Sequence, residues 1–329
     1  MKKFINQVEL VEDQMIQGMV KAYPQYVRKL DCGNVVVRTE KKEGKVALIS
    51  GGGSGHEPAH GGYVGTGMLD AAVAGAVFTS PTPDQIYEGI KAIATDKGVL
   101  MVIKNYTGDV MNFEMAGEMA QMDDIKVAQV VVNDDVAVDG SLYTVGRRGV
   151  AGTVFVHKIA GAKAEEGAEL EEVQRVAQKV IDNVRTMGVA IRPCTVPAAG
   201  KPGFELGEDE MEVGIGIHGE PGTHKEPLRP ADEIVDHILD KILADIDYTG
   251  HEVAVMVNSS GATPLMELFI INNHVADVLA AKGIRVYKTF VGEYMTSLEM
   301  EGFSVSLLRL DDELKALLDA HADTIAFKA

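Results

Sequence analysis

Cysteine is scarce in this sequence of 329 residues, which contains only Cys32 and Cys194. The two residues do not form a C-x-x-C pair. Two isolated thiols support neither a disulfide framework nor a metal site built on thiolates. So low a cysteine count is typical of a protein that works in a reducing compartment.

Long apolar runs are also missing. The longest ones, such as residues 71–78 and 99–103, are far shorter than the roughly 20 residues that a membrane-spanning helix needs. Near the start of the chain, Glu9, Glu12 and Asp13 interrupt the sequence before an apolar signal segment can form. We therefore predict a cytoplasmic protein with no secretory signal and no contact with a membrane.

Positive charge is in short supply. Lysine and arginine contribute 31 charges against 49 from aspartate and glutamate, so the formal net charge is 31 − 49 = −18 at pH 7. The isoelectric point of about 4.9 means that the chain repels phosphate backbones and anionic lipid. We do not expect it to bind nucleic acid.

What the sequence does contain is a balanced globular composition, with 46% hydrophobic and 24% charged residues. At roughly 150 residues per domain, a chain of this length predicts two domains. A proline- and glycine-rich stretch at residues 192–207 follows a long, acid-rich helical pattern at residues 159–187. We place the boundary near residue 185, which gives an N-terminal domain of residues 1–185 and a C-terminal domain of residues 186–329.

Short apolar runs alternate with helical patterns along most of the chain, which is typical of α/β architecture. The predicted strands are residues 45–50, 99–103, 127–132, 213–217, 252–257, 285–291 and 304–310. The predicted helices are residues 84–95, 110–122, 230–246, 264–282 and 311–320. The fold class is therefore α/β, with two α/β domains that each have a central mixed sheet flanked by helices.

The densest motif is G-G-G-S-G-H-E-P-A-H at residues 51–60. Its glycines, directly after a predicted strand, let backbone N–H groups approach a phosphate or a hydroxyl closely. The motif is neither a P-loop nor a dinucleotide fingerprint. It also contains H-E-x-x-H, a pattern found in zinc proteases. Such a protease needs both histidines on one face of a helix. Here His56 follows glycines, and Pro58 fits only the first turn of a helix. We expect no metal, with His56 in the turn and His60 in the following helix; a tight turn with incidental histidines is the alternative.

Two further turns carry candidate groups. Lys104 and Asp109 follow the strand predicted at residues 99–103 and offer an electrophilic contact and a general base, although Asp109 could simply cap the next helix. His218 lies among glycines and before a proline at residues 214–222, although a lone histidine is more often structural. Because all three turns end predicted strands, His56, Asp109 and His218 could line one pocket.

Long segments of the chain resemble the K subunit of bacterial dihydroxyacetone kinase of the phosphotransferase-system type. The matching segments are GGGSGHEPAHGGYVG (51–65), FTSPTPDQI (78–86), IKNYTGDVMNFE (103–114), GRRGVAGT (146–153), CTVPAAGKPGFEL (194–206), GIGIHGEPG (214–222), GATPLMEL (261–268) and YMTSLEMEGFS (294–304). They run in collinear order over essentially the whole chain.

The resemblance implies that His218 attacks the ketone carbon of dihydroxyacetone and forms a hemiaminal, which glycerol cannot do. It implies that Asp109 or His56 is the base at a terminal hydroxyl. It further implies that the substrate is contacted by the following residues: Gly53, Ser54, Gly55, His56, Lys104, Asp109 and His218.

The resemblance also implies the partners. With no P-loop, the chain should bind no cofactor itself and should receive phosphate from a separate L subunit holding ADP and magnesium, which a phosphohistidine subunit recharges. It should form a homodimer. Arg147 and Arg148 are the best candidates for a local basic patch that binds nucleotide, or else they hold turns and subunit contacts. The alternative function is a K-like co-activator that senses dihydroxyacetone and binds a transcription regulator.

Overall fold

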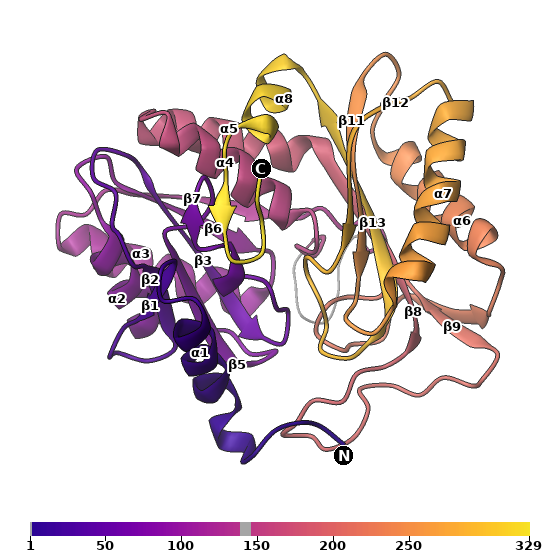
Figure 1. The fold of residues 1–329 in the computed structure, drawn as a ribbon, viewed down its shortest axis with the longest axis horizontal. Helices are drawn as coiled ribbons and strands as arrows, with labels where there is room; N and C mark the ends of the chain where they lie inside the picture. The colour runs from indigo at the N-terminus through magenta and orange to yellow at the C-terminus, as the bar shows by residue number, and fades with distance from the viewer. Residues whose placement is uncertain (1, 139–145) are drawn as a thin grey trace.

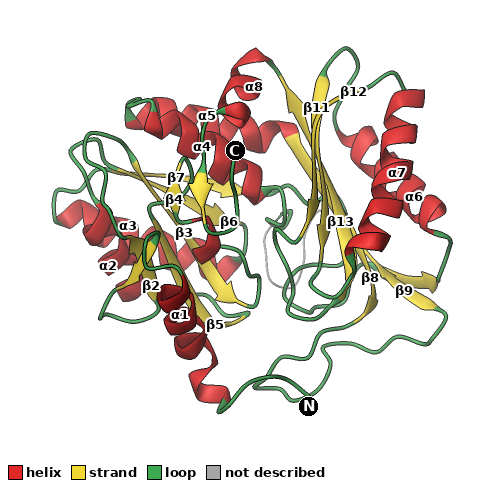
Figure 2. Ribbon diagram, in the orientation of Figure 1, coloured by secondary structure: helices red, strands yellow, loops and turns green. Residues whose placement is uncertain are grey.

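The computed structural model describes residues 2–138 and 146–329 of the chain. Two β-sheets stand beside each other, each accompanied by helices (Figures 1 and 2). The first sheet has the order β1 (Val27–Lys29), β2 (Val35–Arg38), β5 (Ala71–Val77), β3 (Ala47–Ser54), β6 (Val99–Lys104) and β7 (Val127–Val132). Strands β5, β3, β6 and β7 are parallel neighbours, whereas β1 and β2 pair antiparallel, so this sheet is mixed.

The second sheet has the order β10 (His224–Pro227), β9 (Glu210–Val213), β8 (Val184–Arg192), β13 (Glu301–Leu310), β11 (Glu252–Ser259) and β12 (Arg285–Gly292). Its strands pair antiparallel except for β11 and β12, which are parallel. The predicted fold class of two α/β domains with mixed sheets is confirmed. Below, residues 1–185 are called the N-terminal half and residues 186–329 the C-terminal half.

Helices cover both faces of the first sheet. Val99 and Met101 of β6 pack with α2 (Pro83–Ile93) and α3 (Thr107–Met122) on one face. Leu100 and Val102 of the same strand pack with α4 (Thr153–Glu165) and α5 (Leu170–Asn183) on the other face. Successive side chains of a strand point to opposite faces. Helix α1 (Val11–Ala22) lies on the same side as α4, through the buried Ile16.

The second sheet uses its two faces differently. Val253 and Val255 of β11 pack with α6 (Ala231–Asp245) and α7 (Leu265–Ala281), which lie together on one face. Ala254 and Met256 belong instead to the core that includes α4, α5 and α8 (Asp312–Asp319). The largest core therefore continues from one half into the other.

The C-terminal segment returns to the N-terminal half. Leu314 and Leu317 of α8 share the core with Phe155 and Ile159 of α4. After α8, the short strand β14 (Asp323–Thr324) pairs antiparallel with β4 (Gly65–Thr66). The two halves are thus connected by packing and by pairing of strands as well as by the chain itself.

Three sequence-based predictions of elements are wrong. The helical pattern at residues 159–187 is two helices and the start of β8, because the backbone of Gly167 (φ 80°) ends α4. The strand predicted at residues 213–217 ends at Val213, because Gly214 adopts φ 71° and turns the chain. The strand predicted at residues 45–50 continues to Ser54, through three glycines. No prediction was made for the following elements: α1, β1, β2, β4, β5, β10 and β14.

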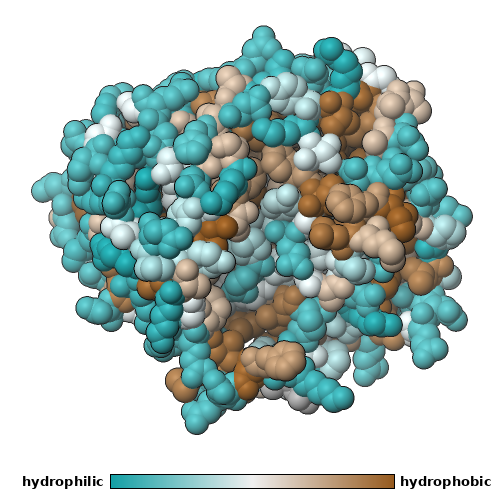
Figure 3. Space-filling model, viewed as in Figure 1, coloured by the Kyte–Doolittle hydropathy of each residue, from teal (hydrophilic) through white to brown (hydrophobic). Residues whose placement is uncertain are grey.

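Apolar side chains gather over α7 on the surface shown in Figure 3. They are Leu265, Met266, Phe269 and Ile270, each more than half exposed. Within the described part of the chain, no helix is long and apolar enough to cross a membrane.

Candidate active site

A cavity of about 660 Å³ lies between the two halves of the molecule. Asp109 and Ser80 line it from the N-terminal half, and His218 and Glu220 line it from the C-terminal half. His56 and Lys104 are fully buried beside it. Its walls also include the following residues: Val77, Phe78, Thr79, Tyr106, Thr107, Gly108, Val196, Gly203, Gly219 and Pro221.

The glycines of β3 bring other groups close to its backbone. A Cβ on Gly52, whose φ is 149°, would lie 2.4 Å from the ammonium nitrogen of Lys104. A Cβ on Gly53 would lie 2.5 Å from the backbone nitrogen of Thr79. Ser54 is held by a 2.7 Å hydrogen bond from its hydroxyl to the carbonyl of Gly75. These residues therefore make room for Lys104 and for the turn that carries Phe78.

His56 comes directly after this glycine segment, with Gly55 tied by backbone hydrogen bonding to Leu298 of the C-terminal half. The Nδ1 atom of His56 lies 2.9 Å from the carbonyl oxygen of Thr296. A carbonyl only accepts, so Nδ1 carries the proton and Nε2 has a free lone pair. Among the described residues, Nε2 has no hydrogen-bond partner. Burial, reinforced by the charge of Lys104, lowers the pKa of His56 to about 3, so the ring is neutral at pH 7.

His218 lies among aromatic rings. Its ring centroid is 4.2 Å from that of Tyr106, 4.8 Å from that of His56 and 5.5 Å from that of Phe78, all in edge-on geometry. Burial, together with the neighbouring His56, Lys104 and Arg148, lowers the pKa of His218 well below its usual range. A neutral imidazole that faces a cavity is suited to nucleophilic attack.

Lys104 ends β6, and its ammonium group reaches three neighbours. Its Nζ lies 3.6 Å from Asp109 Oδ2, 3.1 Å from His60 Nε2 and 3.2 Å from the carbonyl oxygen of Gly51. Burial lowers the pKa of Lys104, while the charge of Asp109 opposes this shift.

Asp109 lies in the first turn of α3, three residues after Tyr106 at the N-cap. Tyr106 makes no capping hydrogen bond with its side chain, and Asp109 is not at the cap position, so the interpretation of Asp109 as a cap is wrong. Its Oδ1 accepts a hydrogen bond from the hydroxyl of Ser80. Burial raises the pKa of Asp109, while Lys104 and Ser80 lower it. A buried carboxylate held by one cation is a plausible general base.

The second histidine of the H-E-x-x-H segment has a different environment. His60 precedes a short 3-10 helix (Gly61–Tyr63) and is not inside a helix, which corrects the prediction. Its Nδ1 lies 2.9 Å from His157 Nε2. Within the described ranges, no group of three histidine, cysteine or acidic residues could hold a metal ion.

The structure thus brings His56, Lys104, Asp109 and His218 together. Sequence reasoning singled out neither Phe78, Ser80 and Tyr106 nor Glu220 as site residues. Phe78, Ser80 and Tyr106 lie in the matching segments at residues 78–86 and 103–114, but nothing in those segments assigned them a role, and their position in space does so. Glu220 lies within the G-I-H-G-E-P-G turn, but the sequence did not indicate its contact with His218.

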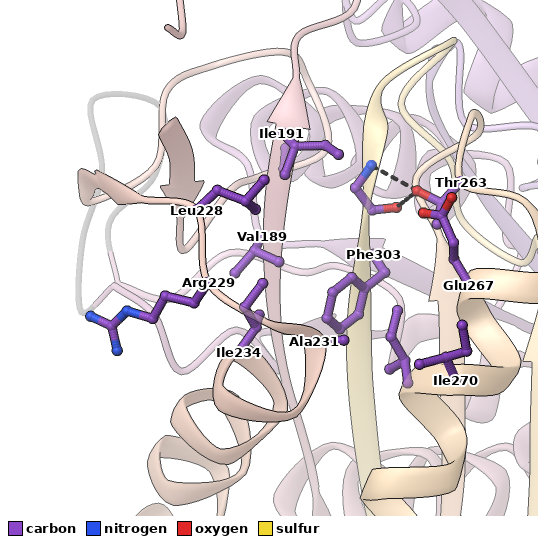
Figure 4. A pocket seen from close by; sticks show the side chains of 13 residues that line it. Val189, Ile191, Leu228, Arg229, Ala231, Ile234, Thr263, Glu267, Ile270 and Phe303 are labelled. Atoms are coloured by element: carbon purple, nitrogen blue, oxygen red, sulfur yellow. Dashed lines mark hydrogen bonds between the residues drawn. The ribbon is translucent and has the colours of Figure 1, made fainter. Parts of the chain in front are cut away.

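A second cavity, of about 190 Å³, is lined mainly by apolar side chains, unlike the cavity that contains His218 and Asp109 (Figure 4). It lies between β8, β13 and the starts of α6 and α7, and apolar side chains such as Val189, Ile234 and Phe303 line it. None of the predicted site residues is in its wall. The polar cavity between the halves is therefore the candidate active site.

Comparison with known proteins identifies one family. The Dak1 domain matches residues 17–326. The dihydroxyacetone-binding subunit DhaK of PTS-dependent dihydroxyacetone kinase 1 from Listeria innocua is 56% identical over 99% of this chain and 100% of its own length. The corresponding subunit of the PEP-dependent enzyme of Escherichia coli is 44% identical over 99% of both chains.

Solved structures agree in fold. The dihydroxyacetone kinase of C. freundii superposes with a TM-score of 0.93 at 36% identity, over 99% of this chain and 60% of that one. A dihydroxyacetone kinase operon co-activator, DhaQ, superposes with a TM-score of 0.89 at 37% identity, over 95% of this chain and 97% of that one. The chain belongs to the Dak1 domain family, which confirms the resemblance drawn from the sequence.

Proposed function

We propose that this protein is the dihydroxyacetone-binding subunit of a phosphoenolpyruvate-dependent dihydroxyacetone kinase. The observation that carries the proposal is the placement of a caged, neutral His218 opposite the Lys104–Asp109 pair across one cavity. The full-length similarity to subunits of that name supports it.

The first step of the proposed mechanism is capture. A lone pair on the imidazole of His218 attacks the ketone carbon, and the carbonyl electrons move to oxygen. That oxygen takes up a proton as the imidazole releases its own N–H proton, so the hemiaminal forms without net loss of protons. The low pKa of His218 favours this step because the ring stays unprotonated.

The second step is phosphoryl transfer to a terminal hydroxyl. Asp109 or Nε2 of His56 accepts the hydroxyl proton, and the oxygen attacks the terminal phosphoryl group of ATP, which a separate L subunit would hold. The bond between that phosphoryl group and ADP breaks, and ADP stays on the L subunit. Lys104 stabilises negative charge beside Asp109, and Gly53, Ser54 and Gly55 contact the substrate. A phosphohistidine subunit recharges the nucleotide, and the chain acts as a homodimer in the cytoplasm.

Arg148 is not available for a nucleotide, because it is 1% exposed and paired with carboxylates. Arg147 forms an ion pair with Asp245 of α6 at 2.6 Å. These contacts favour the interpretation that both arginines hold turns. We therefore expect the isolated chain to phosphorylate no dihydroxyacetone when only ATP and magnesium are added.

The second candidate is a co-activator that captures dihydroxyacetone and binds a transcription regulator. The similarity to the DhaQ structure favours it. The retention of His56, Lys104 and Asp109 around one cavity favours the kinase.

Reconstitution separates the two. We expect the protein with L subunit, phosphohistidine subunit and phosphoenolpyruvate to produce dihydroxyacetone phosphate, and the protein with ATP alone to produce none. If the protein phosphorylates dihydroxyacetone with ATP alone, dependence on a partner subunit is contradicted. If the complete system forms no dihydroxyacetone phosphate although the protein captures dihydroxyacetone, the co-activator function is favoured.

A further inference from the structure

A cluster of buried charges lies directly behind the turn that carries His218. It consists of Arg148, Asp135 and Glu220, of which Arg148 and Asp135 are 1% exposed and Glu220 is 8% exposed. We call these three residues the Arg148 cluster. Asp135 and Arg148 belong to the connection between β7 and α4 in the N-terminal half, whereas Glu220 is two residues beyond His218.

Arg148 joins both halves with its guanidinium group. Its Nε donates to Asp135 Oδ2 at 2.7 Å, and an amino nitrogen donates to the carbonyl of Gly214 at 2.7 Å. The other amino nitrogen lies 3.4 Å from Glu220 Oε1. The second oxygen of Glu220 accepts a 2.8 Å hydrogen bond from the backbone N–H of His218. A continuous chain of contacts therefore runs from the N-terminal half to the backbone of His218.

The N-terminal end of this chain is fixed. The backbone N–H of Asp135 donates to the carbonyl of Arg148 at 3.1 Å, and Oδ1 of Asp135 accepts from the N–H of Ala137 at 2.9 Å. Arg148 and Asp135 are thus linked through their backbones as well as through their side chains.

The backbone N–H groups of the turn have few other hydrogen-bond partners. Of the described backbone amides at residues 216–220, only that of His218 has a hydrogen-bond partner within the described part of the chain. The backbone packs directly on the cluster: a Cβ on Gly216 would lie 1.7 Å from Glu220 Oε1 and 2.7 Å from an Arg148 nitrogen. Besides the ring contacts of His218 and the burial of Ile217, the position of this turn therefore depends on Glu220 and, through it, on Arg148.

Stability alone is a poor reason for such a cluster. Burying three charges costs desolvation free energy, and well-packed apolar side chains of similar size often serve stability equally well or better. The cluster ends on the backbone of the residue that is the proposed nucleophile, in contact with Tyr106 and His56. A positioning role explains that placement, because misplacing a reacting group by about 1 Å can cost about 10²-fold.

We propose that Arg148 and Glu220 are positioning residues that hold the His218 turn against the N-terminal half, in the geometry that captures the substrate ketone. This inference rests on the proposed function, because it concerns the same nucleophile. Neither side chain takes part in the bond changes. They act on the affinity of capture, because they set the position from which His218 attacks the ketone carbon.

The test compares three variants by the dissociation constant for dihydroxyacetone and by the steady-state kinetics of the reconstituted kinase. Glu220→Ala removes the acceptor for the His218 amide, and we expect capture to weaken by about tenfold or more. Arg148→Lys loses the planar fork that joins Asp135, Gly214 and Glu220, and we expect a loss of about three- to tenfold. Glu220→Gln keeps an oxygen that accepts from the amide, and we expect it to restore affinity to within about threefold of the parent.

The kinetic signature is a rise of KM for dihydroxyacetone with a much smaller change of kcat, because Asp109 and Lys104 are not moved. A purely structural role would lower the melting temperature without this split. The matched control is Asp245→Asn, which weakens a contact between Arg147 and α6 across the same two halves. It should leave capture unchanged.

The outcomes are distinguishable. If the parent protein itself captures no dihydroxyacetone, the proposed function fails. If the parent captures it and Glu220→Ala or, should that variant not fold, Arg148→Lys binds it equally well, the positioning role is overturned. Equal losses in Glu220→Gln and Glu220→Ala would also contradict the hydrogen bond as the cause.

Discussion

The two turns that face each other across the cavity are held in different ways. The turn with Lys104 and Asp109 is local: β6 ends at Lys104, α3 begins at Thr107, and both elements are packed in the core. The turn with His218 belongs to no helix or strand. Rings of the other half surround His218, and its backbone N–H is held by Glu220 of the same turn, which in turn contacts Arg148 of the other half. The proposed base is therefore positioned by its own secondary structure, whereas the proposed nucleophile is positioned by long-range charge pairs.

This difference predicts that capture and transfer can be separated by mutation. Changes on the His218 side should affect formation of the adduct. Changes on the Asp109 side should affect phosphorylation of a substrate that is still captured.

The largest expected effect is that of His218→Ala on capture. With no imidazole, the ketone has no partner for a hemiaminal, so the adduct should disappear and binding should weaken strongly. Intact-protein mass measurement under native conditions with dihydroxyacetone checks this. The control is His274→Ala, which changes a histidine on α7 that pairs with Asp236 away from the cavity. An adduct that survives in His218→Ala places the nucleophile elsewhere.

The next effect is that of Asp109→Asn on transfer. The amide keeps the shape of the side chain but cannot accept the hydroxyl proton, so we expect phosphorylation to fall by roughly 10²-fold or more. A coupled assay of dihydroxyacetone phosphate with the complete system measures it. Asp123→Asn, at the other end of α3, is the control. A parental rate in Asp109→Asn would leave His56 as the base.

A smaller effect is expected from Ser80→Ala. The Ser80 hydroxyl donates to Asp109, and this contact lowers the pKa of that carboxyl. Its removal raises the pKa, so the carboxyl stays protonated up to a higher pH. The acid limb of the pH–rate profile should therefore move to higher pH, with a loss of about tenfold or less on that limb and recovery on the alkaline side. A shift to lower pH would contradict the sign of this contact.

The smallest effect is that of pH on capture by the unaltered protein. An exposed histidine is half protonated near pH 6.5, and its nucleophilicity falls below that value. Because burial keeps the pKa of His218 well below this range, the dissociation constant should change by less than about twofold between pH 8 and about pH 6. Titration of dihydroxyacetone binding at several pH values tests it. A loss of affinity centred near pH 6.5 would show an imidazole with an ordinary pKa.

The sequence predicts the local turn better than the long-range one. Continuous apolar runs identify β6 and β7, and polar residues directly after β6 place Lys104 and Asp109 at the sheet edge. His218 was also singled out, but as the residue directly after a strand predicted at residues 213–217. The structure ends that strand at Val213, because nothing in G-I-G-I-H reveals the positive φ of Gly214.

The groups that hold His218 could not be predicted for a physical reason. Arg148 and Glu220 are charged, and charged residues are rarely buried, so composition alone assigns them to the surface. Their burial depends on one another and on Asp135, which is distant from Glu220 in the sequence. Likewise, α5 ends at Asn183 and β8 begins at Val184 with no loop between them, so only sheet pairing with β13 separates the strand from the helix.

The most direct test of the separation is to follow the ketone carbon of isotopically labelled dihydroxyacetone by NMR in the Asp109→Asn variant. The account predicts that the signal of the bound substrate changes from that of a carbonyl to that of a tetrahedral carbon, as in the parent protein, although no phosphorylation follows. A bound substrate that keeps its carbonyl signal in Asp109→Asn, while the parent shows the tetrahedral carbon, would contradict the separate roles of the two turns.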